Sequence, residues 1–224
     1  MNIHKHRITE TECNMNFELR MAELFCILQD SVETDVSVSM FDHKTMQANG
    51  NFFVLMQMIV DMKRMPKAGE TISVKTWHAG LDKLYPLRIY EVYDGTGKFI
   101  GRVDSVWVIL DIVKRRPINP VKAYPEVEWV SGEFKVPKRI KPAEDLKKYE
   151  EFWAKYSDID SNNHVNNTKY IAWVENALGK TPQRLSVNYV AETILDDKIT
   201  AFKNENQVAF YKNEKLVFIA EFDN

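Results

Sequence analysis

The sequence predicts an α+β protein built from two copies of one unit, each an antiparallel sheet that wraps around a central helix. Three observations predict this fold. The order strand, helix and four strands occurs twice along the 224 residues. A proline-rich stretch separates the two copies. Strands with apolar residues on both faces indicate a sheet that is covered on both sides. We therefore expect an internal duplication at low sequence identity.

The first copy opens with a short strand at residues 3–10 and a polar turn at residues 11–16. A broad apolar face over residues 17–32 predicts a buried helix, which we expect to continue with breaks through residues 33–39. Four antiparallel strands follow, the last two of them joined by the hairpin sequence Asp-Gly-Thr-Gly, at residues 52–62, 70–79, 84–93 and 98–110.

A connecting segment follows, in which the character of the sequence changes. Five of the eight prolines lie between residues 113 and 148, interleaved with lysine, arginine and glutamate. Such a composition is typical of an extended linker, and a connector of this length favours a domain boundary. We expect an N-terminal domain at residues 1–113, a linker at residues 114–148 and a C-terminal domain at residues 149–224.

The second copy repeats the order of the first. It has a strand at residues 149–156, a turn rich in Asp, Ser and Asn, and an apolar stripe that predicts a helix at residues 166–178. Gly179 stands where a glycine commonly ends a helix, and Pro182 prevents its continuation. Four further strands are predicted at residues 184–194, 198–203, 206–211 and 216–222.

Composition excludes several classes of protein. A net charge of −2 argues against general binding of nucleic acid, and no apolar run is long enough for a membrane span. The first residues contain no apolar signal region, and Cys13 and Cys26 fit two free thiols, so we expect a cytoplasmic protein. Histidine and cysteine show no spacing typical of zinc sites, and we expect no metal and no cofactor.

The turn before the second helix is the candidate functional site. Asp160, Asn162 and His164 occupy alternate positions, and alternate side chains of an extended segment point the same way. They would converge beside the free N–H groups of a helix N-terminus, which can stabilise a developing oxyanion. The same spacing also fits a capped turn with a surface histidine.

The sequence of this turn resembles that of a known family. Residues 158–173 read DIDSNNHVNNTKYIAW, which is similar to the signature D-x-N-x-H-V-N-N-x-x-Y-I-x-W of the fatty acyl-ACP thioesterases of plants and bacteria. The resemblance also covers strings at residues 56–62, 69–77, 105–110, 114–116 and 189–193, in the family's order. It implies two tandem hot-dog domains, of the bacterial type because the start of the chain does not look like a plant transit peptide.

The resemblance implies an activity. It predicts hydrolysis of fatty acyl-ACP to free fatty acid and ACP, which ends chain elongation, with Asp160, Asn162, His164 and Glu192 as catalytic residues. The family's cysteine is replaced by Thr193, a poor nucleophile without an activating base, so we expect no acyl-enzyme. Asn162 or His164 would hold the thioester oxygen. Either Glu192 and Asp160 activate water, or His164 is the base and Asp160 orients it.

The first copy looks catalytically degenerate. Placing Glu12, Asn14 and Asn16 on the three polar residues of the second turn keeps an acid and an amide but loses the imidazole. Apolar side chains of this copy would instead line an acyl pocket, although each of them also fits simple core packing. The predicted substrate-binding residues are Met21, Phe25, Met56 and Met58.

The implied partner is acyl carrier protein, an acidic protein that carries the fatty acyl group on a phosphopantetheine arm. Basic clusters could dock it by charge complementarity, although each cluster also fits a solvated face. The candidates are Lys63, Arg64, Lys114, Arg115, Arg116, Lys135, Lys138, Arg139 and Lys141. We expect a monomer or homodimer. The alternative functions are an acyl-CoA thioesterase and an acyl-binding hot-dog protein without catalysis.

Overall fold

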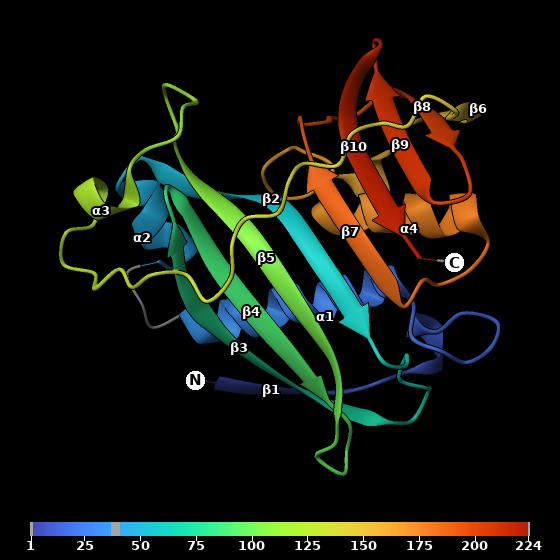
Figure 1. Cartoon of the computed structure of the whole chain (residues 1–224), viewed down its shortest axis with the longest axis horizontal. Coiled ribbons are helices and arrows are strands. Elements are labelled where there is room, and N and C mark those ends of the chain that lie inside the picture. Colours follow the sequence, from blue (N-terminus) through green and yellow to red (C-terminus); the bar gives the residue numbers. More distant parts are fainter. Residues whose placement is uncertain (1, 37–40, 224) are drawn as a thin grey trace.

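The computed structural model describes residues 2–36 and 41–223. Within this part of the chain, ten strands form one antiparallel sheet in the order β1-β3-β4-β5-β2-β7-β10-β9-β8-β6 (Figure 1). Strands β1 to β5 belong to the first copy, and strands β6 to β10 to the second. The predicted duplication therefore appears as two half-sheets joined edge to edge.

The elements of the first copy are β1 (Asn2–Arg7), η1 (Glu10–Glu12), α1 (Met21–Val36), α2 (His43–Ala48), β2 (Asn51–Met62), β3 (Thr71–Asp82), β4 (Tyr85–Tyr93) and β5 (Phe99–Asp111). The remaining elements are α3 (Pro120–Ala123), β6 (Lys147–Trp153), η2 (Tyr156–Asp158), α4 (Asn167–Leu178), β7 (Arg184–Tyr189), β8 (Lys198–Lys203), β9 (Gln207–Lys212) and β10 (Lys215–Phe222). The predicted order of strands and long helices is confirmed.

The two half-sheets meet where β2 pairs with β7. The ladder runs from Gln57 opposite Asn188 to Asp61 opposite Arg184. An unpaired edge strand exposes backbone N–H and C=O groups, and this pairing satisfies both inner edges at once. In Figure 1 the strands of the second copy, orange to red, continue the sheet begun by the green and cyan strands.

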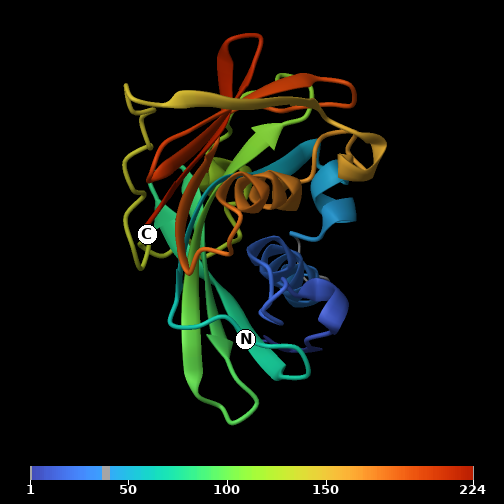
Figure 2. The same cartoon turned by 90° about the vertical axis from the view of Figure 1, so that its right-hand side faces the viewer.

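Helices α1 and α4 lie on the same face of the sheet, side by side (Figure 2). They share one hydrophobic core with strands from both copies, because each helix turns its apolar stripe to the sheet. The core residues from the helices include Leu24, Phe25, Leu28, Tyr170, Ile171 and Val174.

One side chain links the two helices directly. The carboxylate of Glu175, on α4, accepts the N–H of Met21 at 2.8 Å and the N–H of Ala22 at 3.0 Å. It also accepts the hydroxyl of Thr181 at 2.7 Å. Backbone N–H groups at a helix start have no partner inside the helix, so a residue of the second helix caps the first. Burial raises the pKa of Glu175.

The segment between β5 and β6 crosses the other face of the sheet. Phe134 and Val136 pack on an outer cluster of Ala79, Leu87, Ile89 and Val106. Its backbone lies so close to Gly80 that a Cβ there would be 2.7 Å from the carbonyl oxygen of Ser131. The predicted linker is thus extended and packed along the sheet.

Several predicted boundaries were wrong, and a turn explains three of them. Strand β1 ends at Arg7, since the N–H of Thr9 donates to the Glu12 carboxylate and starts a 3-10 turn. Helix α1 begins at Met21 because Phe17 adopts a left-handed backbone, with φ of 59°. Strand β7 ends at Tyr189, where the chain turns toward the start of α4. Of the predicted continuation of α1, residues 37–40 lie outside the described part.

Two short helices were not predicted. Asp42 caps α2 by accepting the N–H of Lys44 and Thr45, and Asn119 caps α3, whose first residue is Pro120. An Asn-Pro pair at a helix start is a recognisable signal, although prolines in this stretch also fit an extended linker.

Candidate active site

The turn between η2 and α4 closes on itself. Oδ1 of Asp160 accepts the N–H of Asn162 at 2.8 Å and of His164 at 3.3 Å, and the N–H of Asp160 donates to the carbonyl of His164 at 2.8 Å. Asn163 has a left-handed backbone, with φ of 62°. The segment is therefore not extended as predicted, and Asp160 organises its backbone rather than touching the His164 ring.

The start of α4 follows directly. Asn166 is the N-cap, and its Oδ1 accepts the N–H of Thr168 at 2.9 Å. One N–H that was predicted to be free is therefore occupied. The other end of the helix is as predicted, since Gly179 caps it in the left-handed conformation with φ of 67°.

A second segment brings the carboxylate. The N–H of Val165 donates to the carbonyl of Thr193 at 2.7 Å, which fastens the segment after β7 against the turn. This contact places Glu192 beside His164, with Oε2 and Nε2 3.3 Å apart. Lys212 Nζ donates to the backbone carbonyl of Glu192 at 3.0 Å. Two residues from separate sequence motifs thus meet, and it is Glu192, not Asp160, that contacts the imidazole.

An arginine from the segment that follows β5 reaches the same carboxylate. Nη2 of Arg115 donates to Oε2 of Glu192, the oxygen that also faces His164. Sequence reasoning placed Arg115 only in a basic cluster. No local signal could have found this contact, because 77 residues separate the two side chains.

Neighbouring hydroxyl groups are buried. Thr193 has no exposed surface, which removes its hydroxyl from solvent. Burial raises the pKa of Tyr170, on the inner side of α4, to about 12, and raises that of Tyr189 well above its ordinary value. Both tyrosines therefore stay protonated near neutral pH, and neither can act as a base there.

The predicted acyl-pocket residues are distributed unevenly. Met21, Phe25 and Met58 lie together in the core between the sheet and the helices, each at most 4% exposed. Met56 is half-buried and sits at a β-bulge, where β2 gains one residue relative to β5 between Leu55 and Gln57.

Several of the predicted docking cations are paired within the protein. Arg64 binds Glu70 at 2.7 Å and Asp94 at 3.2 Å, and Lys114 lies 3.6 Å from Asp111. Similarly, Lys135 lies 3.4 Å from Asp82, and Lys63 stacks over the ring of Phe99 at 4.5 Å. The side chains of Arg116, Lys138, Arg139 and Lys141 are exposed.

The first copy has the same turn with other side chains. Oδ1 of Asn14 accepts the N–H of Asn16 at 2.9 Å and of Glu18 at 3.2 Å, and Phe17 takes the left-handed position. Asn14, Asn16 and Glu18 therefore match Asp160, Asn162 and His164. The predicted alignment, which began at Glu12, was wrong by two residues because it matched acid with acid instead of matching hydrogen-bond roles.

The same comparison identifies the counterpart of the glutamate. The N–H of Leu19 donates to the carbonyl of Pro66 at 2.8 Å, as that of Val165 does to Thr193. Pro66 thus matches Thr193, and the residue before it, Met65, matches Glu192. Met65 is buried. The first copy therefore has neither an imidazole at the position of His164 nor a carboxylate at the position of Glu192.

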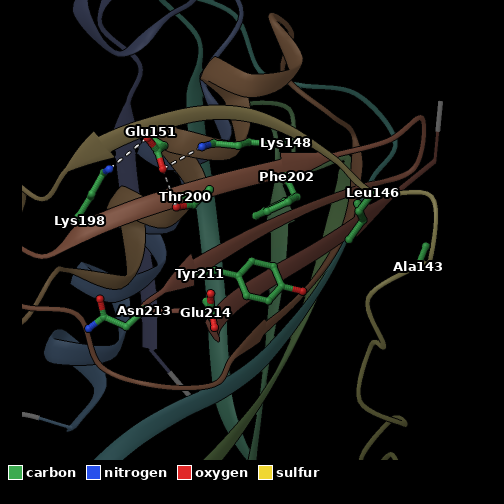
Figure 3. Close-up of a pocket in the computed structure, with 10 residues that line it drawn as sticks. All are labelled: Ala143, Leu146, Lys148, Glu151, Lys198, Thr200, Phe202, Tyr211, Asn213 and Glu214. Atoms are coloured by element: carbon green, nitrogen blue, oxygen red, sulfur yellow. Dashed lines mark hydrogen bonds and ion pairs between the residues drawn. The ribbon is translucent and has the colours of Figure 1, made fainter.

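A groove of about 610 Å³ lies elsewhere, on the outer face of the second half-sheet (Figure 3). Its Thr200 and Phe202 alternate along β8 with Ile199 and Ala201, which face the core. Glu151 stands between Lys148 at 2.9 Å and Lys198 at 3.1 Å. None of the four predicted catalytic residues lines this groove, so it is separate from the candidate site.

The described residues contain neither a cluster that could hold a metal ion nor a helix that could cross a membrane. No three His, Cys, Asp or Glu side chains in residues 2–36 and 41–223 are grouped so as to hold a metal ion. In the same part of the chain, no helix has the length and apolar character needed to cross a membrane.

Comparison with solved structures supports the fold. An acyl-ACP thioesterase from Bacteroides thetaiotaomicron superposes with a TM-score of 0.85 at 26% identity, covering 99% of this chain and 96% of that one. A 12:0-ACP thioesterase from Umbellularia californica has a TM-score of 0.83 at 18% identity, with the same coverage. The chain therefore has the predicted double hot-dog fold.

Comparison with sequences identifies the family. The acyl-ACP thioesterase N-terminal domain matches residues 3–125, and the acyl-ACP thioesterase C-terminal domain matches residues 141–219. A chloroplastic palmitoyl-acyl carrier protein thioesterase from Cuphea hookeriana is 33% identical over 136 residues, which are 54% of this chain and 32% of that protein. The match thus spans about a third of the length of this curated relative. The two family matches together show that the chain belongs to the acyl-ACP thioesterase family.

Proposed function

We propose that this chain hydrolyses fatty acyl-ACP thioesters to free fatty acid and ACP, and so ends chain elongation. The observation that carries the proposal is the contact between His164 Nε2 and Glu192 Oε2 at 3.3 Å, beside a turn held by Asp160. An imidazole and a carboxylate in contact form a unit that can accept a proton from water. Membership of the family supports the same substrate class.

In the proposed reaction, a water molecule lies against Glu192 and His164 and gives its proton to this pair. The resulting hydroxide attacks the thioester carbonyl carbon, and the carbonyl oxygen becomes an oxyanion. The side-chain amide of Asn162, exposed at the tip of the turn, donates to that oxygen. Collapse of the tetrahedral intermediate breaks the C–S bond, and the thiolate of the phosphopantetheine arm takes the proton from the pair.

Asp160 has two roles in this proposal. Its Oδ1 holds the turn through the N–H groups of Asn162 and His164. In addition, its negative charge would attract the positive charge that develops on the His164 imidazole when the pair takes up the proton of the water. The burial of Thr193 supports direct attack by water over an acyl-enzyme.

We assign the two copies different tasks. Residues 1–113 form a domain that holds the acyl chain, residues 114–148 are the linker, and residues 149–224 form the catalytic domain. Met21, Phe25 and Met58 already line the apolar space between α1 and the sheet. Since they are packed there, an acyl chain would enter by displacing side chains, which unbranched Met permits. Met56 would contribute from the bulge.

The proposed partner, acyl carrier protein, is acidic, so it would dock on basic side chains that are not already paired. Lys138, Arg139 and Lys141 are exposed, and none of them forms an ion pair with another described residue. All four proposed catalytic residues come from one chain, so a monomer or a homodimer could carry the activity. Cys13 and Cys26 are both free, which fits the reducing cytoplasm.

The test is thiol release from a panel of acyl-ACPs and the matching acyl-CoAs, by wild type, His164→Ala and Glu192→Gln. We expect turnover of acyl-ACP by the wild type and its loss in both variants. Faster turnover of acyl-CoA than of acyl-ACP would show that the chain is an acyl-CoA thioesterase instead. A folded wild type that binds acyl-ACP without releasing thiol would make the chain an acyl-binding protein.

A further inference from the structure

The carboxylate of Glu192 is held from two directions. Arg115 Nη2 and His164 Nε2 both contact Oε2, and Lys212 holds the backbone carbonyl of the same residue. Among the described residues, none donates a hydrogen bond to Oε1 of Glu192. One oxygen is therefore anchored, and the other is left for a water molecule.

Arg115 is presented by a defined turn at the end of β5. Oδ1 of Asp111 accepts the N–H of Val113 at 2.9 Å and of Lys114 at 2.7 Å, and the N–H of Arg115 donates to the carbonyl of Asp111 at 2.9 Å. Arg115 itself has a left-handed backbone, with φ of 53°. A non-glycine residue adopts this conformation at a cost in free energy, so the surrounding turn fixes where its side chain starts.

The side chain is guided further by packing. The guanidinium carbon of Arg115 lies 5.8 Å from the centre of the Phe52 ring, on the neighbouring strand β2. A planar guanidinium stacked on a ring keeps its N–H groups in a fixed plane. Glu192, by contrast, lies in a loop with its side chain 39% exposed, so it would sample several rotamers if it were not anchored.

We propose that Arg115 is a positioning residue for hydrolysis, which anchors one oxygen of Glu192 so that the other can hold the attacking water. This inference rests on the proposed function. It removes Arg115 from the docking cluster, and it adds a residue of the linker to the active site of the second copy. A carboxylate misplaced by about 1 Å can lose on the order of 10²-fold in rate, which is the size of effect the anchor would prevent.

Arg116 provides a matched control. It is the next residue, it carries the same charge, and it is exposed, while its described contact is the backbone carbonyl that accepts the N–H of Asp111. Removing either arginine changes the local charge equally. Only the removal of Arg115 frees Glu192.

The experiment is steady-state kinetics of the 224-residue wild type, Arg115→Ala, Arg115→Lys and Arg116→Ala. The substrates are acyl-ACP and an acyl-pantetheine thioester that lacks the carrier protein, and thermal melts confirm folding. We expect Arg115→Ala to lower kcat by about 10- to 100-fold on both substrates with KM nearly unchanged. Arg115→Lys should recover part of this loss, because an ammonium group keeps the positive charge but lacks the planar set of N–H donors of a guanidinium group. Arg116→Ala should leave kcat unchanged.

A double-mutant cycle separates positioning from a general effect on structure. In a Glu192→Gln background, Arg115→Ala should cause little further loss, because the anchored group is already gone. Equal increases in KM for Arg115→Ala and Arg116→Ala on acyl-ACP alone would make Arg115 a docking residue and overturn the inference. A wild type that releases no thiol from any substrate overturns the proposed function, and this inference with it.

Discussion

The turns that precede α1 and α4 have the same backbone and almost entirely different side chains. Asn14 and Asp160 each accept two N–H groups of their own turn, and Phe17 and Asn163 take the same left-handed position. An amide oxygen thus builds this turn as well as a carboxylate oxygen does. The comparison teaches that the turn needs only an oxygen acceptor, and we attribute the negative charge of the second turn to the proposed reaction.

The pair that faces the turn differs more sharply. The second copy has His164 in contact with Glu192, and the first has Glu18 and the buried Met65 at the matching positions. In addition, Glu175 occupies N–H groups at the start of α1. The first turn therefore has neither an imidazole–carboxylate pair at the matching positions nor a free helix start.

Replacing His164 by the residue that the first copy has at the matching position should have the largest effect. His164→Glu places the first copy's residue in the second turn and should lower kcat by about 10²- to 10⁴-fold, the usual contribution of a general acid–base. Thiol release from acyl-ACP measures this. The reverse change, Glu18→His, should create no second site because Met65 offers no carboxylate. Wild-type turnover by His164→Glu would show that the pair is not the catalytic unit.

A finer exchange isolates the charge of Asp160. Since Asn14 makes the same two backbone contacts, Asp160→Asn should keep the melting temperature within about 2 °C. It should still lower kcat by about 10²-fold, because the charge that stabilises the protonated pair is lost. Melting curves and thiol release, measured on the same sample, test the expected melting temperature and the expected loss of kcat. Full activity in this variant would reduce Asp160 to a turn-forming residue.

The cap between the helices can be removed without touching either turn. Glu175→Ala leaves the N–H groups of Met21 and Ala22 without a partner and should lower the free energy of unfolding by about 2–4 kcal/mol. Urea unfolding measures the change. Gln29→Ala, at the matching position of α1, is the control and should lower the free energy of unfolding clearly less than Glu175→Ala does.

The same residue gives a dependence on pH. Burial raises the pKa of Glu175, so the folded protein holds this proton more tightly than the unfolded chain does. The stability that protonated Glu175 contributes is therefore fully present below its ordinary pKa of 4.5, and it is lost as the pH rises through the raised pKa. The free energy of unfolding of wild type minus that of Glu175→Gln should fall from pH 4.5 toward neutral. A difference that rises with pH would contradict the direction of the shift.

The smallest effect concerns the left-handed position. Phe17 is 60% exposed there, so its ring contributes little packing, whereas asparagine tolerates this backbone better. Phe17→Asn should raise the free energy of unfolding by about 0.5–1 kcal/mol. Asn163→Phe should lower it by a similar amount. Urea unfolding measures both changes in the free energy of unfolding. Changes of unequal size would show that the two turns tolerate the left-handed backbone differently.

Much of the fold was predictable because its signals are local. The period of apolar residues and the turn residues between them gave the element order, and Gly179 marked the end of α4. The motif at residues 158–173 located the second turn. Boundaries failed where a side chain bonded its own backbone, as Asp160 and Asn14 do, since such bonds shorten a strand or delay a helix without changing composition.

The long-range part of the site was not predictable. Glu175 looks like a solvated helix residue until α1 is placed beside it, and Arg115 looks like one of a run of cations until β5 ends next to the segment after β7. Both contacts depend on how the half-sheets join. A single sequence contains no period or spacing that reports on that junction.

The β2–β7 ladder has a consequence for how the two copies could diverge. In a symmetric pair of separate identical chains, any substitution appears at both sites simultaneously. Here the two copies are joined through one chain and one ladder, from Gln57–Asn188 to Asp61–Arg184, so each turn can change alone. The first copy can therefore carry Glu18 and Met65 at the positions where the second carries His164 and Glu192. Covalent fusion thus released the molecule from the constraint of symmetry, and one copy could specialise at no cost to the other.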